Sequence, residues 1–332
     1  MNMKKLALLM VSTALLCGCQ SKDSIENYEI GTWQGFRTSA VSLTFDDGCQ
    51  NQFDIAVPML DEFDFKATFY PVGQWVQNWA PLRKCAANGH EVSSHTYHHP
   101  NLAEYSADSL NTELQQAIDT LRANVPMADC SSIAYPFCIV PDESIVGKYH
   151  IAARNCDGRI EPPTPADYLN LSSFCVGTET NIINAIDLIG VFSRTMSEKG
   201  WCTILFHEID NGPGYSPFPS DELKKALEYL SDNDTCYWVA TFANVAKYAQ
   251  ERDKAVIRSL TLYNEDKIEL SLACGLDPQV FNVPLTVRRA LPEGWTNAEA
   301  EQNGRDCNMY INDGYMYFDV LPNGETVVVK KR

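Results

Sequence analysis

The sequence is short of positive charge and of long apolar runs, and both shortages narrow the possible functions. It has 26 Lys and Arg against 43 Asp and Glu, which gives a net charge of −17. A surface with this excess of negative charge repels polyanions, so we expect no nucleic-acid partner. After residue 19 no apolar run approaches the ~20 residues that a membrane-spanning helix requires. The sequence therefore predicts no membrane-embedded domain after that point.

The first nineteen residues have the pattern of an export signal. A basic start, "MNMKK", precedes the apolar run "LALLMVSTALL", which is too short to span a bilayer and is typical of a signal peptide. The run ends in "LLCGC", which resembles a bacterial lipoprotein box with cleavage before Cys19 and a lipid on its sulfur; an ordinary signal peptide is the alternative. We expect an exported lipoprotein of the cell envelope, with a lipoprotein signal segment over 1–19 that is cleaved before Cys19, a tether over 20–39, and membrane contact only through Cys19.

No CxxC pair occurs among the twelve cysteines, so a thiol-based metal knuckle or redox motif is absent. An oxidising compartment permits disulfides, but the spacings form no compact framework and do not specify a pairing. Cys49 and Cys138 both lie close to candidate site residues. For these two we expect free thiols rather than a disulfide.

Strand-like and helix-like segments alternate from residue 40 to about 255, which is typical of a parallel α/β domain. Strands are predicted over 40–45, 66–72, 90–94, 131–137, 201–209 and 236–241. Helices are predicted over 53–63, 79–89, 107–125, 180–200, 220–233 and 242–252. Ser106 and Ser220 are the expected N-caps of two of them. Pro58 fits the first helix only if regular helix begins near it.

The C-terminal segment, residues 258–332, has a different sequence pattern from the segment before it. It is rich in alternating strand patterns separated by turn sequences such as "NDG" and "PNG", and no helical pattern of useful length occurs. We predict a small antiparallel β-sandwich. This accessory domain is either a binding module or a structural partner of the first domain, and we favour the structural role.

Polar side chains gather where the predicted strands end. Asp46 and Asp47 follow the first strand, His95 and His99 follow the third, and His207 lies at the end of the strand "TILF". Each pattern alone is typical of an ordinary turn, but the carboxyl ends of parallel strands meet at one edge, so we expect the five side chains to converge. A helical turn would place His95 and His99 on one face. One Asp with two His suits a divalent metal, beside which the second Asp accepts a proton and the other His donates one.

The motifs "LTFDDG", "HTYHHP" and "ILFH" resemble the polysaccharide deacetylase (NodB-homology) family, carbohydrate esterase family 4, over roughly residues 40–250. The resemblance implies a distorted, incomplete (β/α) barrel that hydrolyses acetyl groups from amino sugars or sugar hydroxyls with a divalent metal. By motif, Asp46 is the general base, His207 is the general acid, and Asp47, His95 and His99 hold the metal. Zn²⁺ is the expected ion, with Co²⁺, Ni²⁺ and Mn²⁺ as alternatives.

The same resemblance points to residues that contact substrate. The third motif of the family, here "AYPF", supplies a backbone N–H to the oxyanion near Phe137. A Gly- and Pro-rich loop follows His207, and its aromatic residues Tyr215 and Phe218 are candidates to stack on a sugar. The expected substrate and oxyanion residues are Tyr135, Pro136, Phe137, Leu205 and Tyr215.

One departure from the family pattern concerns the base. Ala134 and Cys138 stand where the family commonly has an arginine and a glycine, and that arginine orients the catalytic Asp. We expect Arg154 or Arg159 to orient Asp46 instead.

Three alternatives remain open from the residues alone. The chain is a deacetylase of N-acetyl groups, an O-acetyl esterase of the acetyl-xylan type, or a catalytically silent glycan-binding lipoprotein on the same fold. The expected partner in each case is a glycan, and the oligomeric state is not specified. His90, His98 and His150 are predicted to be structural rather than ligands.

Overall fold

The computed structural model describes residues 28–260 and 266–332. The expected signal peptide over 1–19, the lipidation site at Cys19 and the start of the tether lie outside the described residues. Among the described residues no helix combines the length and the apolar character needed to cross a membrane.

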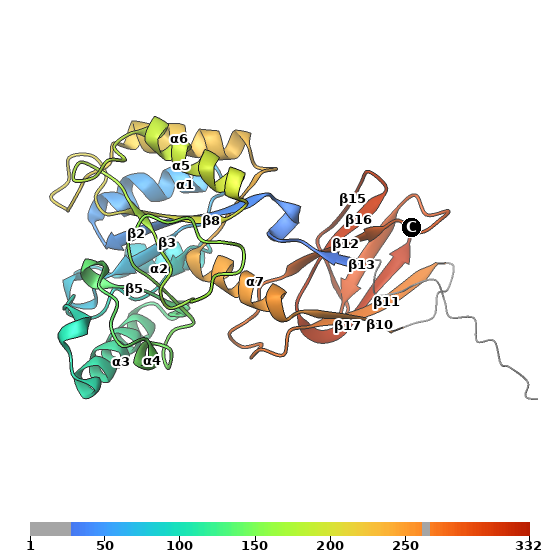
Figure 1. Cartoon of the computed structure of the whole chain (residues 1–332), viewed down its shortest axis with the longest axis horizontal. Helices are drawn as coiled ribbons and strands as arrows, with labels where there is room; N and C mark the ends of the chain where they lie inside the picture. Colours follow the sequence, from blue (N-terminus) through green and yellow to red (C-terminus); the bar gives the residue numbers. More distant parts are fainter. Residues whose placement is uncertain (1–27, 261–265) are drawn as a thin grey trace, which may run out of the picture.

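The larger domain is built on a parallel sheet around one buried strand, β2 (Ser39–Asp47) (Figure 1). β3 (Thr68–Pro71) pairs with the end of β2, β8 (Trp201–Phe206) pairs along its other side, and β9 (Tyr237–Val239) pairs with its start. β4 (Glu91–Val92) and β7 (Phe174–Cys175) extend the sheet at its two edges. All of these pairs are parallel, which confirms the predicted α/β class.

The parallel arrangement continues beyond β4. A single bridge joins Ser94 to Ile133, which lies in β5 (Ser132–Ala134), and β5 pairs with β6 (Ala152–Arg154). This register places Ala134 directly beside Arg154.

Seven α-helices are found in the described part of the chain: α1 (Val57–Glu62), α2 (Ala80–Ala87), α3 (Ala107–Asn124), α4 (Glu143–Val146), α5 (Ala185–Glu198), α6 (Ser220–Asp232) and α7 (Phe242–Lys254). Ser106 caps α3 as predicted, since its side chain accepts a hydrogen bond from the Ser109 N–H. The predicted cap of α6 is wrong: Pro219 occupies the cap position and Ser220 is already helical. Pro58 lies in the first turn of α1, which follows directly on a π-helical turn over Gln52–Ala56.

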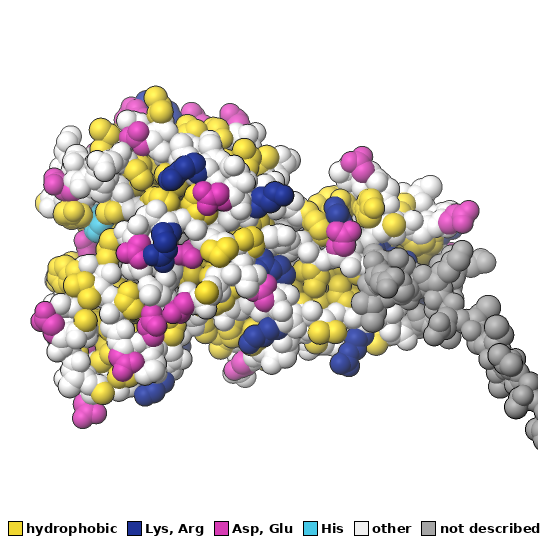
Figure 2. All heavy atoms as spheres, in the orientation of Figure 1, with side chains coloured by type: hydrophobic (Ala, Val, Ile, Leu, Met, Phe, Trp, Pro, Cys, Tyr) yellow, Lys and Arg dark blue, Asp and Glu magenta, His cyan; other side chains and the backbone are white. Residues whose placement is uncertain are grey.

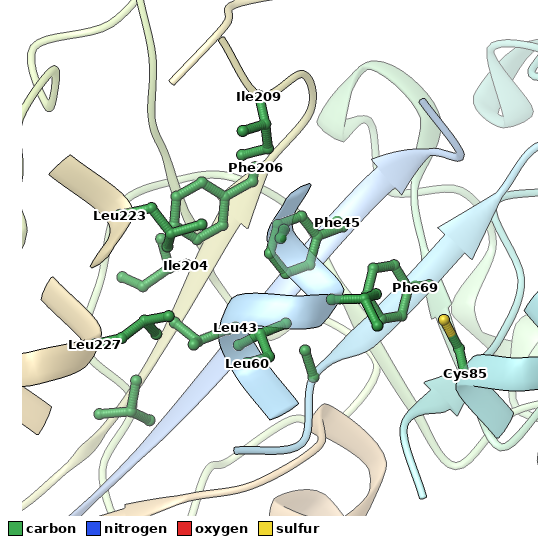
Figure 3. Packing of buried hydrophobic residues seen from close by; sticks show 14 of the residues in the cluster. Leu43, Phe45, Leu60, Phe69, Cys85, Ile204, Phe206, Ile209, Leu223 and Leu227 are labelled. Atoms are coloured by element: carbon green, nitrogen blue, oxygen red, sulfur yellow. The ribbon is translucent and has the colours of Figure 1, made fainter. Parts of the chain in front are cut away.

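The core of this domain lies between the sheet and the helices on one of its faces. Figure 3 shows strand residues packing against α1, α2 and α6; its labelled members are Leu43, Phe45, Leu60, Phe69, Cys85, Ile204, Phe206, Ile209, Leu223 and Leu227. β2 is buried over nearly its whole length. Its polar residues Ser42 and Thr44, which alternate with apolar ones, are hydrogen-bonded to β8.

The C-terminal part contains two antiparallel sheets, and its described residues have no α-helix, as predicted. One sheet has the order β1 (Tyr28–Ile30), β12 (Leu285–Ala290), β16 (Tyr315–Val320), β15 (Met309–Asn312). The other has the order β10 (Val256–Ser259), β11 (Lys267–Ala273), β17 (Asn323–Lys331), β13 (Ala298–Gln302), β14 (Arg305–Asp306). One buried cluster includes residues of both sheets.

The expectation of a tether over 20–39 is wrong from residue 28 onward. β1 pairs with β12 of the C-terminal part, and the chain then turns back to enter β2 (Figure 1). Trp33 between them is fully buried, and the Tyr248 hydroxyl of α7 donates to the Gly31 carbonyl at 2.8 Å. The two parts of the molecule are therefore joined by a strand and a helix rather than by a single linker.

Candidate active site

Asp46 and Asp47 end β2 in a strained turn. Asp46 is almost fully buried, whereas about a fifth of the Asp47 side chain is exposed. Asp47 has φ +69° and Gly48 has φ +75°. Asp tolerates this left-handed conformation better than most residues, and strain of this kind concentrates at functional sites.

His95 and His99 lie in an irregular loop after β4, not in the expected helical turn. The Glu113 carboxylate of α3 accepts hydrogen bonds from the backbone N–H groups of Tyr97 at 2.8 Å and His98 at 2.6 Å. These bonds fold the loop so that the His95 and His99 rings lie 4.8 Å apart. The two histidines thus meet as predicted, by a different local structure.

Asp47, His95 and His99 bring three ligand atoms to within 4.8 Å of one another. The Asp47 Oδ1 atom lies 3.6 Å from His95 Nε2 and 3.9 Å from His99 Nε2. The His95 Nδ1 atom is 2.9 Å from the Ala134 carbonyl, to which it donates, so its Nε2 is left to face the cluster. Asp47 Oδ1 is buried and has no hydrogen-bond partner among the described residues. An unsatisfied carboxylate oxygen beside two oriented imidazoles fits a divalent cation.

Burial sets the protonation states in this cluster. It lowers the pKa of His95 to about 3 and that of His99 to about 4. It also raises the pKa of Asp47 to about 7, to which the neighbouring Asp46 carboxylate adds. Both imidazoles are therefore neutral at pH 7, as metal ligation requires, and a bound cation would replace the proton on Asp47.

Arg154 pairs with Asp46 at the centre of the site. The Arg154 Nη2 atom contacts Asp46 Oδ1, and both side chains are buried. Arg159, the other predicted candidate, is half-exposed and pairs with Asp157 and Glu161 instead. The arginine that contacts Asp46 therefore lies on β6. It is next to Ala134 of β5, the position at which the family motif commonly has an arginine.

His207 follows β8 and is held by a residue that the sequence did not indicate. The Gln52 Nε2 group donates to the His207 carbonyl at 2.7 Å and to the Asp46 carbonyl at 2.5 Å. The His207 ring lies 4.9 Å from the Tyr215 ring, and its Nδ1 is buried without a partner in the described part of the chain. Burial lowers the pKa of His207 to about 4, an effect that the Asp46 carboxylate opposes.

Exposed aromatic side chains surround the histidines. Phe137 is 62% exposed with its ring 4.7 Å from His99, and Trp75 is 46% exposed at 5.0 Å from the same ring. Tyr215 is also exposed. Figure 2 shows a histidine among apolar side chains at the end of the larger domain away from the β-domain. Trp75 was missed because it follows a strand without any motif.

Several predicted substrate residues are buried and do not face the site. The Tyr135 hydroxyl donates to the Leu169 carbonyl, and Tyr135 belongs to a separate core cluster. Pro136 and Leu205 are buried, and Phe218 packs on Phe206 at 5.4 Å. A sugar-stacking role is therefore wrong for Phe218, and neither Tyr135 nor Leu205 presents its side chain at this surface.

The expectation that Cys138 is a free thiol is also wrong. Cys138 forms a disulfide with Cys156, whereas Cys49 is free as predicted. The disulfide joins the loop of Phe137 to the segment just after Arg154. Phe137 and Cys138 both have left-handed backbone conformations, so this covalent link anchors a strained loop to the segment that follows Arg154.

The remaining histidines have structural partners, as predicted. His98 pairs with Glu113 at 2.7 Å, and His90 Nδ1 accepts from the Ala67 N–H at 3.1 Å. His150 Nδ1 lies 3.1 Å from the Cys130 carbonyl.

Comparison with known proteins agrees with these motifs. Residues 34–149 match the family model described as polysaccharide deacetylase. A gellan lyase from a Bacillus species is 26% identical over 91% of this chain and 13% of the lyase. A chitooligosaccharide deacetylase from Sinorhizobium fredii is 32% identical over 33% of this chain and 52% of that enzyme. The solved structure of a protein assigned as a polysaccharide deacetylase from Mycobacterium smegmatis has a TM-score of 0.53 at 18% identity, covering 71% of this chain and 98% of that one.

The chain spans from about an eighth to about half of the length of these two curated relatives. The structural likeness supports the fold of the larger domain, and the family model covers the segment that carries both aspartates and the histidine loop. The resemblance predicted from the motifs is confirmed: residues 34–149 of this chain match the polysaccharide deacetylase model, and relatives named deacetylases are similar over part of the chain.

Proposed function

We propose that this protein is a divalent-metal-dependent hydrolase that removes acetyl groups from a carbohydrate. The observation that carries the proposal is the arrangement of one buried carboxylate, Asp46, against Arg154 on one side and the cluster of Asp47, His95 and His99 on the other. A catalytically silent glycan-binding protein would have no need for a buried ion pair beside an unsatisfied carboxylate oxygen.

Asp47, His95 and His99 would hold the cation. When bound, it would polarise the acetyl carbonyl and lower the pKa of a water molecule. One carboxylate and two imidazoles favour Zn²⁺, with Co²⁺, Ni²⁺ and Mn²⁺ as alternatives.

Asp46 is the proposed general base. Arg154 binds its Oδ1 atom, while Oδ2 lies 3.7 Å from His95 Nε2, on the side of the metal cluster. The carboxylate is thus oriented to accept a proton from water that attacks the acetyl carbon. The backbone N–H of Phe137 is the proposed donor to the oxyanion, since the Cys138 N–H already bonds to the Tyr135 carbonyl.

His207 is the proposed general acid for the departing amine or alkoxide. Its low pKa in the substrate-free site means that its proton has to be acquired during the reaction, when negative charge develops beside it. Trp75, Phe137 and Tyr215 would contact the sugar ring through their exposed faces.

The names of the relatives favour acetylated amino sugars over acetylated hydroxyls, since they include chitooligosaccharide and peptidoglycan-N-acetylglucosamine deacetylases. The finer fold is part of the proposal: the bridge from Ser94, just after β4, to Ile133 of β5 supports an incomplete (β/α) barrel, and the cluster shared by the two C-terminal sheets supports a sandwich. Export as an envelope lipoprotein anchored at Cys19 remains a prediction from the N-terminal pattern.

The test is acetate release from chitooligosaccharides, peptidoglycan and acetylated xylan with added Zn²⁺ or Co²⁺. Asp46→Asn is expected to lower the rate by about 100-fold or more, because it removes the base and keeps the shape. His98→Gln is the matched control in the same loop and should leave the rate close to that of the wild type. Metal analysis of Asp47→Asn is expected to show loss of bound metal. Equal acetate release by the wild type and Asp46→Asn would refute the proposal.

A further inference from the structure

The outward face of the sheet β1-β12-β16-β15 carries a row of side chains that the proposed reaction does not use. Glu29, Arg288, Tyr317 and Tyr310 are direct cross-strand neighbours on successive strands. Cross-strand neighbours point to the same face of a sheet, so these four side chains form one continuous row.

Two tyrosines of this row form a flat platform. The Tyr310 and Tyr317 rings stack with centroids 4.7 Å apart and an interplanar angle of 4°. Phe36 packs edge-on against Tyr317 at 5.4 Å, and Arg288 lies over the Phe36 ring at 4.6 Å. Tyr317 is buried by these neighbours, whereas Tyr310 is 44% exposed. The outer ring is thus held rigidly while much of its surface faces outward.

Amide and carboxylate groups flank the platform. Asn308 and Asn312 lie two residues on either side of Tyr310, so strand alternation places them on its face. The Asn308 Nδ2 group donates to Asp319 Oδ2 at 2.8 Å, and the Thr286 hydroxyl donates to Asp319 Oδ1 at 2.5 Å. These bonds fix the orientation of the polar groups, which reduces the entropy lost on binding a ligand.

The larger domain supplies the opposite wall. The Arg37 Nε group donates to the Asp234 carbonyl at 2.7 Å, and this bond fixes the position of the Arg37 guanidinium on that wall. Between this wall and the platform lies a cavity of about 550 Å³ lined by Arg37, Asp234, Tyr310, Asn312 and other residues. A second cavity of about 480 Å³ has Asn308 and Asp319 in its lining too, so the two cavities are neighbours; we call the pair the groove.

The lining chemistry selects the class of ligand. Carbohydrates combine an apolar C–H face, which packs on an aromatic ring, with hydroxyls that both donate and accept hydrogen bonds. Asn308, Asn312 and Asp319 offer donors and acceptors beside the Tyr310 ring. The first cavity has one cation, Arg37, against the two acids Asp234 and Asp319, so an anionic ligand is disfavoured. An amphipathic helix would require a mostly apolar lining, which this groove lacks.

We propose that this groove binds a neutral stretch of a glycan chain. It is remote from the acetyl-hydrolysing site, because Arg37 precedes β2 and Asp46 lies near its far end. At about 3.3 Å per strand residue, the two positions are roughly 25–30 Å apart. A polymer long enough to reach both sites would be held at a raised effective concentration, whereas a short oligosaccharide would occupy one site at a time.

The test is calorimetric titration of the full chain with chitohexaose, xylohexaose and cellohexaose. The wild type is expected to bind at least one of them, and Tyr310→Ala to weaken that binding by about tenfold through loss of ring contact. Tyr310→Phe keeps the ring and should bind close to the wild type. Trp75→Ala, at the other site, should leave this binding unchanged.

The binding readout is separate from catalysis. Tyr310→Ala is expected to release acetate from short substrates at the wild-type rate, so failure of the proposed reaction and failure of this proposal are distinguishable. If Tyr310→Ala lowers the unfolding temperature, Asn312→Ala serves in its place, since Asn312 is exposed at the same groove. Binding of no hexasaccharide by the wild type, or unchanged affinity in the variant that remains folded, would overturn the proposal.

Discussion

The guanidinium of Arg154 reaches Asp46 from β6, the strand beside the one that carries the corresponding arginine in the common family motif. The parallel register that pairs Ala134 with Arg154 makes this possible. The backbone carbonyl of Ala134 is also the hydrogen-bond partner of His95 Nδ1. One pair of neighbouring residues thus orients both the proposed base and one proposed metal ligand.

This assignment predicts the effect of changing Arg154. Arg154→Lys keeps a positive charge but loses the fixed planar guanidinium, so kcat is expected to fall by about tenfold or more, with KM changed much less. Arg154→Met is expected to lower kcat further and also to destabilise the fold by about 3 kcal/mol or more, because it leaves Asp46 buried without its partner. Steady-state kinetics and urea unfolding measure the two effects.

Arg159→Met is the matched control, because Arg159 is half-exposed and pairs with Asp157 and Glu161 rather than with Asp46. A purely structural role for Arg154 would show as lost stability with kcat preserved in the folded fraction, and that result would contradict the positioning role.

At the scale of elements, the site depends on loops that depart from regular structure. Asp47, Thr96, His99 and Phe137 all have positive φ without being glycine. Helical spacing correctly indicated that His95 and His99 lie together, but tertiary bonds from Glu113 of α3 produce that geometry. The conformational preferences of the loop residues cannot predict this loop, because its conformation is stabilised by an element distant in sequence.

α7 carries a buried acid whose titration should be visible in stability. Burial raises the pKa of Glu251 to about 8 from its ordinary value of 4.5, although the Val283 N–H and Lys247 oppose the shift. The folded protein therefore holds a proton on Glu251 that the unfolded chain releases above pH ~4.5. The stability contributed by this proton is complete at low pH and is lost as pH rises toward 8.

Glu251→Gln should remove this dependence. Between pH 5.5 and 7.5 the free energy of unfolding of the wild type is expected to fall relative to that of Glu251→Gln, by up to about 1 kcal/mol per pH unit. Urea unfolding at the two pH values measures the difference. Glu228→Gln on the exposed face of α6 is the control and should track the wild type. Parallel pH profiles for Glu251→Gln and the wild type would show that Glu251 is ionised in the folded state.

At the scale of the whole molecule, the two domains share one hydrophobic cluster. Trp33 and Tyr248 are buried together with Val287 and Phe318 of the C-terminal part, and β1 completes a sheet of that part. This shared cluster favours a structural role for residues 258–332. The groove proposed to bind glycan lies where the two domains meet.

Deletion of residues 258–332 is therefore expected to destabilise the larger domain. It removes the partner strand of β1 and uncovers Trp33 and Tyr248, each of which buries roughly 150–250 Å² in a typical core. The truncated chain should be poorly soluble or should unfold at least about 10 °C below the full chain, as followed by circular dichroism. Cooperative unfolding at the temperature of the full chain would show instead that the two parts are independent.

The sequence by itself determined the parallel α/β class, the change to β structure near residue 257, and the five side chains that the structure brings to one end of β2. These follow from hydrophobic periodicity and from motifs at strand ends, both of which are local in the chain. Only the tertiary structure decided that Arg154 rather than Arg159 contacts Asp46, that Cys138 pairs with Cys156, and that residues 28–30 complete a sheet of the C-terminal part. Each of these joins segments distant in sequence, and such contacts are set by packing and register rather than by the preferences of the residues themselves.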